Sequence, residues 1–311
     1  MVACVRTDML HFSAPIGALI EVTDEDAADF LHSQFSNSLP SEVGQLRYGL
    51  WLDHRGRIHG DSTILRLEEE RFFLLSWATS RKALIAKLGA HIIADDVVLT
   101  DCTDAFGSVA LLGPGAAQWL KSNGFQLPAA DEFSQRNELF LFQPRPSPPS
   151  DAWQIIGPME RIHEVTTALS SLTPPSSPDY WHFARIQAGH PLIPNEVGPE
   201  DTPIEAGLES LCSWRKGCFL GQEVVARQHR LGRRSRSLVV VNVAGEIAGG
   251  SLPVGLLDAE TIVGTLRAVE QKDGQQLGLA MLKSRYLENA QRRTLFIENS
   301  TVKVTLDDTV R

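Results

Sequence analysis

The most informative stretch of this chain is KGCFLGQE, residues 216–223. Two glycines flank Cys218, and glycine lets a backbone turn sharply or approach a ligand closely. Residues 222–228 predict a short helix, which places Cys218 just before a helix N-terminus. The helix dipole and the nearby cation of Lys216 both stabilise a thiolate. Cys218 is therefore the best candidate for a reactive, catalytic thiol, with Lys216 as its partner.

The cysteines also bear on compartment and metal binding. The chain has four cysteines, too few and too scattered for a disulfide framework, and none forms a C-x-x-C pair. We expect no metal site and a reducing compartment, the cytoplasm. For Cys218 the residues alone leave open a buried thiol that packs a turn, because free cysteine is among the most buried residue types. Cys212 has no activating neighbours and is expected to be structural.

A basic cluster follows the KGCFLGQE stretch. The whole chain is acidic, with 29 basic and 38 acidic residues and a net charge of −9. Within ten residues it nevertheless carries five arginines: Arg227, Arg230, Arg233, Arg234 and Arg236. The cluster is a candidate site for phosphate, carboxylate or a nucleic-acid backbone. The alternative, equally open, is an interdomain loop whose arginines pair with surface carboxylates.

Length and composition indicate an ordinary globular protein. The 311 residues predict two or three domains, and 43% hydrophobic with 22% charged residues exclude a largely disordered chain. The N-terminus resembles no secretory signal, and no apolar run approaches the roughly 20 residues that span a bilayer. We expect a protein with no membrane segment.

Hydrophobic periodicity predicts mixed α and β structure before residue 189. Expected strands cover 16–22, 48–53, 57–67, 71–76, 97–101, 108–112 and 153–156. Three of them, between residues 48 and 76, form a predicted meander. Expected helices cover 27–35, 79–88, 116–122, 159–172 and 180–188. Two proline-rich stretches, 143–150 and 173–179, are predicted surface connections.

Beyond residue 235 the chain becomes rich in short strands. The expected strands are 237–243, 261–270, 277–283 and 294–306, separated by Gly, Pro and Asp. This spacing predicts a small barrel or sandwich. We therefore divide the chain into a region 1–235 and a C-terminal β-barrel domain 236–311.

Asp61 and Asp53 are the acidic candidates in the N-terminal region. Asp61 interrupts an apolar strand after a glycine, where a carboxylate can face a cleft. The alternative is a turn or edge residue, the commoner setting for an aspartate at a strand start. We find no Ser-His-Asp elbow, phosphate-binding loop or dinucleotide glycine motif.

The string at 216–223 closely resembles the signature K-G-C-[YF]-x-G-Q-E of the YgfZ family of folate-binding proteins, relatives of the glycine-cleavage T-protein. Weaker resemblances to family segments occur in the expected order along the chain: FLHSQFSN at 30–37, LDHRGRI at 52–58, ARIQAGHP at 184–191 and TPIEAGL at 202–208. The last has Thr202 in place of the family's first isoleucine.

This resemblance implies an α+β fold, a T-protein-like ring of two α/β subdomains plus a C-terminal β-barrel around a central folate cavity. It implies a tetrahydrofolate-binding accessory protein, more an accessory than a catalyst, that supports iron–sulfur cluster assembly or repair and indirectly tRNA thiolation. Implied partners are folate and iron–sulfur enzymes or cluster-assembly proteins, and the expected state is a monomer. The implied folate-binding residues are Asp61, Arg185, Gln187, Gly217, Gln222, Glu223 and Arg227.

Two departures from the T-protein matter. Its paired acidic residues are reduced here to Asp61 alone, and the glutamate that holds the pterin is replaced by Gln187. A neutral amide lacks the charge that pairs with pterin N–H groups. Both changes argue against aminomethyl transfer, which stays the enzymatic alternative, as a tetrahydrofolate-dependent aminomethyltransferase or demethylase. A tRNA-binding protein is the second alternative, disfavoured by the acidic total and by arginines without interleaved aromatics.

Overall fold

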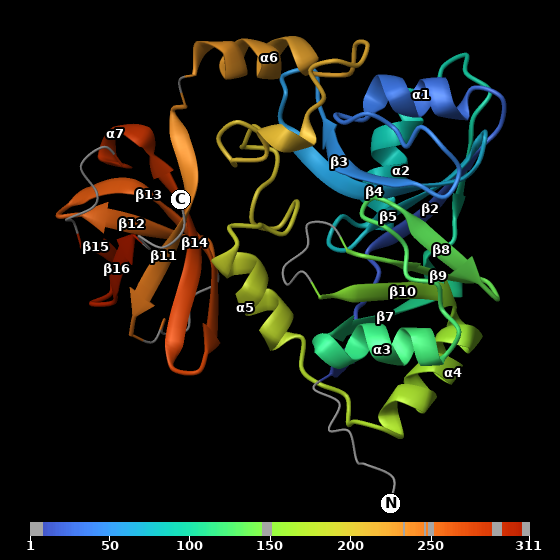
Figure 1. The fold of residues 1–311 in the computed structure, drawn as a ribbon. Helices are drawn as coiled ribbons and strands as arrows, with labels where there is room; N and C mark the ends of the chain where they lie inside the picture. The colour runs from blue at the N-terminus through green and yellow to red at the C-terminus, as the bar shows by residue number, and fades with distance from the viewer. Residues whose placement is uncertain are drawn as a thin grey trace, which may run out of the picture. The chain divides into compact units, whose positions relative to one another are not determined.

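The computed structural model of the protein describes residues 9–144, 151–232, 234–245, 247, 252–287 and 294–306. The chain forms two compact units. Unit 1 consists of Met1–Gly49 and Asp61–Pro178, and unit 2 consists of Leu50–Gly60 and Asp179–Arg311. Figure 1 shows the elements of both units, and each unit is described by itself below.

The first sheet of unit 1 contains the predicted meander. Its strand order is β3-β4-β5-β2-β6. The strands are β3 (Leu46–Leu52), β4 (Ile58–Glu68), β5 (Arg71–Ser76), β2 (Ala18–Thr23) and β6 (Val98–Asp101). The helices α1 (Ala27–Gln34) and α2 (Arg81–Gly89) belong to the same part of the chain. Ser80 caps α2 by accepting a hydrogen bond from the backbone N–H of Ala83.

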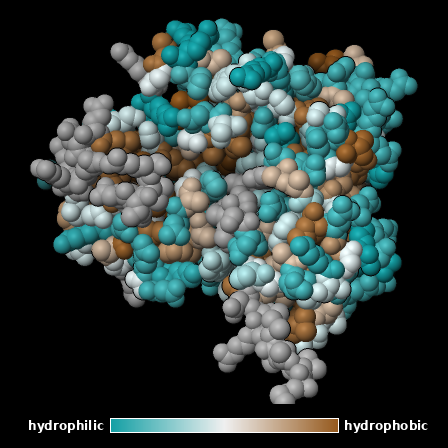
Figure 2. Space-filling model, in the orientation of Figure 1, coloured by the Kyte–Doolittle hydropathy of each residue, from teal (hydrophilic) through white to brown (hydrophobic). Residues whose placement is uncertain are grey.

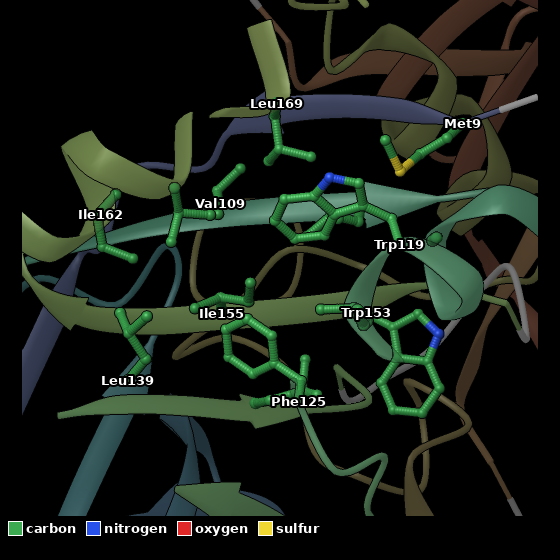
Figure 3. Packing of buried hydrophobic residues seen from close by; sticks show 14 residues of the cluster. Met9, Val109, Trp119, Phe125, Leu139, Trp153, Ile155, Ile162 and Leu169 are labelled. Carbon is green, nitrogen blue, oxygen red and sulfur yellow. The ribbon is translucent and has the colours of Figure 1, made fainter. Parts of the chain in front are cut away.

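The second sheet of unit 1 has the order β1-β7-β10-β9-β8. Its strands are β1 (Leu10–Ser13), β7 (Phe106–Leu112), β10 (Trp153–Pro158), β9 (Leu139–Phe142) and β8 (Phe133–Arg136). A short 3-10 helix η1 (Thr103–Ala105) precedes β7, and the α-helices are α3 (Pro114–Ser122) and α4 (Met159–Ser170). One face of the sheet is packed against these helices in a core that includes Trp119, Ile155 and Ile162 (Figure 3).

The two sheets of unit 1 share an apolar layer. We call it the inter-sheet layer and define it by its buried residues Leu19, Leu46, Leu65, Phe73, Leu75, Phe140, Phe142 and Ile156. The rings of Phe73 and Phe140 meet edge to face with centroids 5.7 Å apart, so the layer joins one sheet directly to the other.

Unit 2 contains a closed barrel. Its strand order is β11-β14-β13-β12-β15-β16, and β11 also pairs with β16, which closes the ring. The strands are β11 (Arg236–Ala244), β12 (Val254–Asp258), β13 (Thr261–Lys272), β14 (Gln275–Lys283), β15 (Leu295–Ile297) and β16 (Lys303–Leu306). A short helix α7 (Ser284–Leu287) follows β14. The α+β fold class with a C-terminal barrel is therefore confirmed.

The rest of unit 2 positions the KGCFLGQE stretch. It contains α5 (Asp179–Gln187), the 3-10 helix η2 (Glu209–Leu211), α6 (Gln222–Leu231) and the tip of the β3–β4 hairpin. A separate core holds these segments together and includes Leu52, Ile58, Ile204, Phe219 and Val225. The hairpin tip is thus packed with α6 although about 170 residues of sequence separate them.

Several elements differ from the sequence prediction. Strands β1, β8, β9 and β12 were not expected, and the single strand expected at 294–306 is two strands, β15 and β16. The compact units differ in extent from the regions 1–235 and 236–311, which remain a prediction about domains. The proline-rich stretch 143–150 lies mostly outside the described residues.

The surface shown in Figure 2 is mainly hydrophilic, with hydrophobic residues in smaller groups. Among the helices that the structure describes, none combines the length and hydropathy needed to cross a bilayer.

Candidate functional site

The segment 216–221 is a loop that leads directly into α6. Phe219 is buried, with 5% of its surface exposed, and Val225 on α6 is completely buried in the same core. Between these apolar contacts and the start of the loop, the side chain of Cys218 is exposed. The interpretation of Cys218 as a buried thiol that packs a turn is therefore wrong, because Phe219 fills that role. Cys212 is buried in this core, as expected for a structural cysteine.

The start of α6 is in backbone contact with the hairpin tip. Gly221 has a positive φ of 81°, and a β-carbon there would overlap the carbonyl oxygen of Asp53 and lie 3.0 Å from the α-carbon of Gly56. Gly56 also has a positive φ, 69°, and its β-carbon would lie 2.7 Å from Cγ2 of Val225. Only glycine meets both requirements, a left-handed backbone and no side chain. The segments LDHRGRI and KGCFLGQE are therefore fitted to each other.

Asp53 stabilises the hairpin turn. Its Oδ1 accepts hydrogen bonds from the backbone N–H groups of Arg55 at 2.8 Å and Arg57 at 2.9 Å, and Oδ2 lies 3.4 Å from Nε2 of His59. Burial alone would raise the pKa of Asp53, but these hydrogen bonds and His59 lower it overall. This acidic candidate is ionised and serves the turn.

Lys216 is partly buried beside the loop. Burial lowers the pKa of its ammonium from 10.5 to about 8. Its Nζ lies 5.2 Å from the centroid of the Phe219 ring, a cation–π geometry. At neutral pH the side chain remains mainly a cation, as the thiolate hypothesis requires, and it gives up its proton more readily than an ordinary lysine.

The remaining predicted residues of this stretch lie on one loop and one helix. Gly217 is exposed, Gln222 is partly buried in the first turn of α6, and Glu223 and Arg227 are exposed. Arg227 forms no ion pair with any residue that the structure describes. One turn further along, His229 stacks on Trp214 with ring centroids 4.5 Å apart. Sequence reasoning missed this aromatic pair because the two rings are fifteen positions apart.

Much of the arginine cluster is used within the chain. Arg236 pairs with Glu205 at 3.0 Å and with Asp201 at 3.3 Å, and the side chain of Asp201 is completely buried. Arg234 pairs with Glu209. These contacts agree with the interpretation of an arginine loop that pairs with carboxylates. Arg227 and Arg230 on α6 are exposed, and Arg233 lies outside the described residues.

Glu205 is central to this ion-pair network. Its Oε1 also accepts a hydrogen bond from Ser235 at 2.6 Å, and Arg57 from the hairpin tip lies 3.6 Å from Oε2. Burial alone would raise the pKa of Glu205, but the hydrogen bonds and charge of Arg236 lower it overall. The network fixes the first barrel strand to the TPIEAGL segment.

Helix α5 carries Arg185 and Gln187. The guanidinium of Arg185 is buried and donates two parallel hydrogen bonds of 2.7 Å to Glu196. A third donor, Nε, lies 3.3 Å from Nδ1 of His182. Because these donors are engaged, any effect of Arg185 on a ligand passes through the segment it orders. Gln187 is exposed at the end of the helix, where Gly189 with φ 73° ends it.

Asp61 lies inside unit 1, on the central strand β4. It is 7% exposed, and β4 has β3 on one side and β5 on the other, so the turn-or-edge interpretation is wrong. The hydroxyl of Tyr48 donates to Oδ2 at 2.8 Å, and Thr79 donates to Oδ1 at 2.7 Å. Burial raises the pKa of Asp61 to about 6, although both hydrogen bonds oppose the rise.

Tyr48 and Thr79 are functional candidates that sequence reasoning missed. Thr79 was expected as a helix cap, but Ser80 caps α2 and leaves the Thr79 hydroxyl to bind Asp61. Burial, with the neighbouring Asp61 charge, holds the pKa of Tyr48 well above its usual value, so its hydroxyl keeps its proton and remains a donor. The result is a buried carboxylate that can gain or release a proton close to neutral pH.

Asp61 therefore belongs to unit 1, and the other eight predicted site residues belong to unit 2. Six of those eight share the loop 216–221 and α6, and two lie on α5. Within the described parts of the chain, no group of three or more His, Cys, Asp or Glu side chains is placed to hold a metal ion.

Comparisons with known proteins agree with the fold. Residues 2–133 match the model of the GCVT N-terminal domain family. The chain is 28% identical to the aminomethyltransferase of Aquifex aeolicus over 66% of its own length and 57% of that protein, less than two thirds of the relative. It is 23% identical to the tRNA-modifying protein YgfZ of Colwellia psychrerythraea, over 72% of this chain and 68% of that protein.

A solved structure gives the same result for the fold. The glycine cleavage system aminomethyltransferase T from Bartonella henselae superposes on 98% of this chain and 87% of its own with a TM-score of 0.80 at 19% identity. At this identity the likeness establishes the shared fold.

Proposed function

The chain belongs to the family of GCVT-domain proteins, and from this premise we propose that it is a tetrahydrofolate-binding accessory protein that supports iron–sulfur cluster assembly or repair through Cys218. The observation that carries the proposal is the exposed thiol on a loop anchored at Phe219 and Val225. A thiol presented in this way is available to a partner, whereas a packing cysteine is buried like Cys212.

The residues of unit 1 fit a folate. A pterin ring presents N–H donors, and Asp61 offers a buried carboxylate whose two oxygens are oriented by Tyr48 and Thr79. In the ionised form that carboxylate accepts a further hydrogen bond, which is stronger in a buried setting than in water. Tetrahydrofolate, when bound, supplies nitrogen atoms that carry one-carbon units. The folate contacts of Gly217, Gln222, Glu223, Arg227, Arg185 and Gln187 remain proposals.

Two measurements test this proposal. Calorimetric titration of the full chain with tetrahydrofolate under anaerobic conditions should give saturable binding; its absence at every accessible concentration contradicts the folate part. For the thiol, Cys218→Ser should fail to restore the activity of a cluster-dependent enzyme in a deletion strain. Cys102→Ser is the matched control, because it removes a thiol elsewhere and should restore that activity. Full rescue by Cys218→Ser removes the assigned role.

A second candidate function is favoured by Asp61. Curated relatives carry the name aminomethyltransferase, and a buried carboxylate with a pKa of about 6 is suited to proton transfer near neutral pH. The chain would then form methylene-tetrahydrofolate from an aminomethyl donor, and Asp61→Asn would abolish the reaction while Cys218→Ser would not. No product with any aminomethyl donor leaves the accessory role in place.

A further inference from the structure

A second polar side chain is buried in unit 1 and has no partner. Gln154 on β10 is 2% exposed, and its Nε2 has no hydrogen-bond partner in the described part of the chain. Most buried polar groups in folded proteins are hydrogen-bonded, so each exception needs an explanation. A donor that the fold itself does not use is available to a ligand.

The strand pattern shows which way Gln154 points. Its neighbours Trp153 and Ile155 lie in the core beside the helices, and side chains alternate between the two faces of a strand. Gln154 therefore shares its face with Ile156, which belongs to the inter-sheet layer. Its cross-strand partners are Ala110 on β7 and Phe142 on β9, whose side chains contain no acceptor. This pairing explains why the amide has no partner.

The opposite sheet presents Asp61 to the same layer. On β4, Leu65 belongs to the inter-sheet layer, and by alternation Thr63 and Asp61 share its face. The layer is apolar at Leu65 but carries a carboxylate at Asp61. Two buried polar groups of different kinds thus point into one layer from its two sheets, an acceptor from β4 and a free donor from β10.

We propose that Gln154 is a ligand-binding residue whose Nε2 donates a hydrogen bond to a carbonyl oxygen or ring nitrogen of a pterin-type heterocycle, while Asp61 accepts one from a ring N–H. A heterocyclic amide presents both kinds of group on one edge, which matches an acceptor and a donor held by opposite sheets. The inference rests on the proposed folate binding and adds to it the residue that reads the heterocycle.

A binding role and a structural role predict opposite results for the same substitution. If Gln154 held the fold together, its loss would lower stability. Because its Nε2 satisfies nothing in the chain, Gln154→Met removes a buried unsatisfied donor with little change in volume, and stability should hold or rise. Only a ligand that uses the amide would register its loss.

The experiment is calorimetric titration of full-length wild type and Gln154→Met with tetrahydrofolate, together with the thermal unfolding of both unliganded proteins. We expect roughly three- to tenfold weaker binding in the variant, the effect of one hydrogen bond, and an unfolding temperature that is unchanged or higher. Ser108→Ala is the control: the hydroxyl of Ser108 donates to the carbonyl of Ala14, so its loss should lower stability and leave affinity unchanged.

The outcomes are distinct. Wild-type binding with equal affinity in Gln154→Met overturns the assignment of Gln154 but leaves the proposed function standing. Equal weakening in Ser108→Ala overturns it as well, because a general packing effect then accounts for the loss. A lower unfolding temperature for Gln154→Met identifies a structural role. No binding by the wild type contradicts the proposed function itself and Gln154 with it.

Discussion

Gly221, at the start of α6, lies against Gly56 at the tip of the β3–β4 hairpin so closely that a β-carbon on Gly221 would be 3.0 Å from the Gly56 α-carbon. The two glycines come from segments far apart in the sequence. Their contact brings LDHRGRI to the helix that follows Cys218, and both glycines have the positive φ that other residues rarely adopt. The thiol loop is therefore held by a backbone-to-backbone contact that requires these residue types.

Gly221→Ala should destabilise unit 2 strongly. The substitution combines a left-handed backbone, which costs about 1 kcal/mol or more for alanine, with overlap of the Asp53 carbonyl. We expect a loss of at least about 3 kcal/mol in the free energy of unfolding, measured by denaturant titration. Gly232→Ala is the control, because Gly232 also has a positive φ, 61°, but its β-carbon would meet nothing within 4 Å. It should lose only about 1 kcal/mol; equal losses in the two variants would mean that the contact is unimportant.

Asp61 should make stability fall as pH rises. Its pKa in the folded chain is about 6, against 3.8 for the ordinary group, so between these values the folded state binds more protons than the unfolded state. The difference corresponds to about 3 kcal/mol that is lost between pH 4 and pH 6. Asp61→Asn keeps the shape without the charge. The variant should therefore be more stable than wild type at pH 7 and similar to it at pH 4, as measured by urea unfolding at each pH.

Asp53→Asn is the matched control for this pH profile, because the sign is reversed. The pKa of Asp53 is lowered, so its contribution is present above pH 4 and is lost on acidification through its folded pKa. Asp53→Asn should be less stable than wild type at pH 7, with the gap closing at low pH. Parallel profiles for wild type and Asp61→Asn from pH 4 to pH 7 would refute the assignment to Asp61.

The sequence was sufficient for most of the fold, and the exceptions have physical causes. The meander and the α2 cap follow from local periodicity and turn residues. The hairpin β8–β9 escaped because its turn is Asn137-Glu138, with φ of 47° and 66°; the common signal for such a turn is Asn-Gly. β12 escaped because Pro253 and Gly255 weaken the strand pattern, which only the closed barrel restores.

The site was predictable only in part. Exposure of Cys218 depends on Phe219 occupying the core, and local sequence does not say which of two adjacent apolar-type residues turns inward. Asp61 was identified as a candidate, but its partner Tyr48 is on a different strand, and only pairing of β3 with β4 brings them together. Burial of Arg185 depends on Glu196, eleven residues away in a loop. Tertiary contacts decide each of these cases.

Cys218 and Cys212 should differ sharply in accessibility. Cys218 is exposed, and Cys212 is 4% exposed within the core that includes Phe219. A thiol reagent such as iodoacetamide should label Cys218 rapidly in the native protein, and Cys212 only after denaturation. Peptide mass spectrometry of timed samples measures both sites in one experiment. Rapid native labelling of Cys212 would contradict the packing of this core.

Lys216 should be the early-reacting lysine under mild alkaline conditions. With a pKa of about 8, about half of its amine is neutral at pH 8, against under roughly 1% for a lysine of ordinary pKa. Limited acetylation at pH 8 should therefore modify Lys216 ahead of the average lysine, by peptide mass spectrometry, although its partial burial slows reagent access. If Lys216 reacts only at the pH of ordinary lysines, burial does not shift its proton affinity.

Arg236 should be structural, in contrast to Arg234 two residues earlier. Arg236→Ala leaves the completely buried carboxylate of Asp201 with one cation fewer and removes the nearest partner of Glu205, and breaking a buried pair costs about 3 kcal/mol or more. Arg234→Ala removes a pair with Glu209 that is largely in contact with solvent, and should cost less than about 1 kcal/mol. Denaturant unfolding compares the two directly. Salt-sensitive tRNA binding that both variants lose, with stability equal in the two, would instead identify these arginines as a nucleic-acid surface, because phosphate contacts depend on exposed charge and not on the buried network.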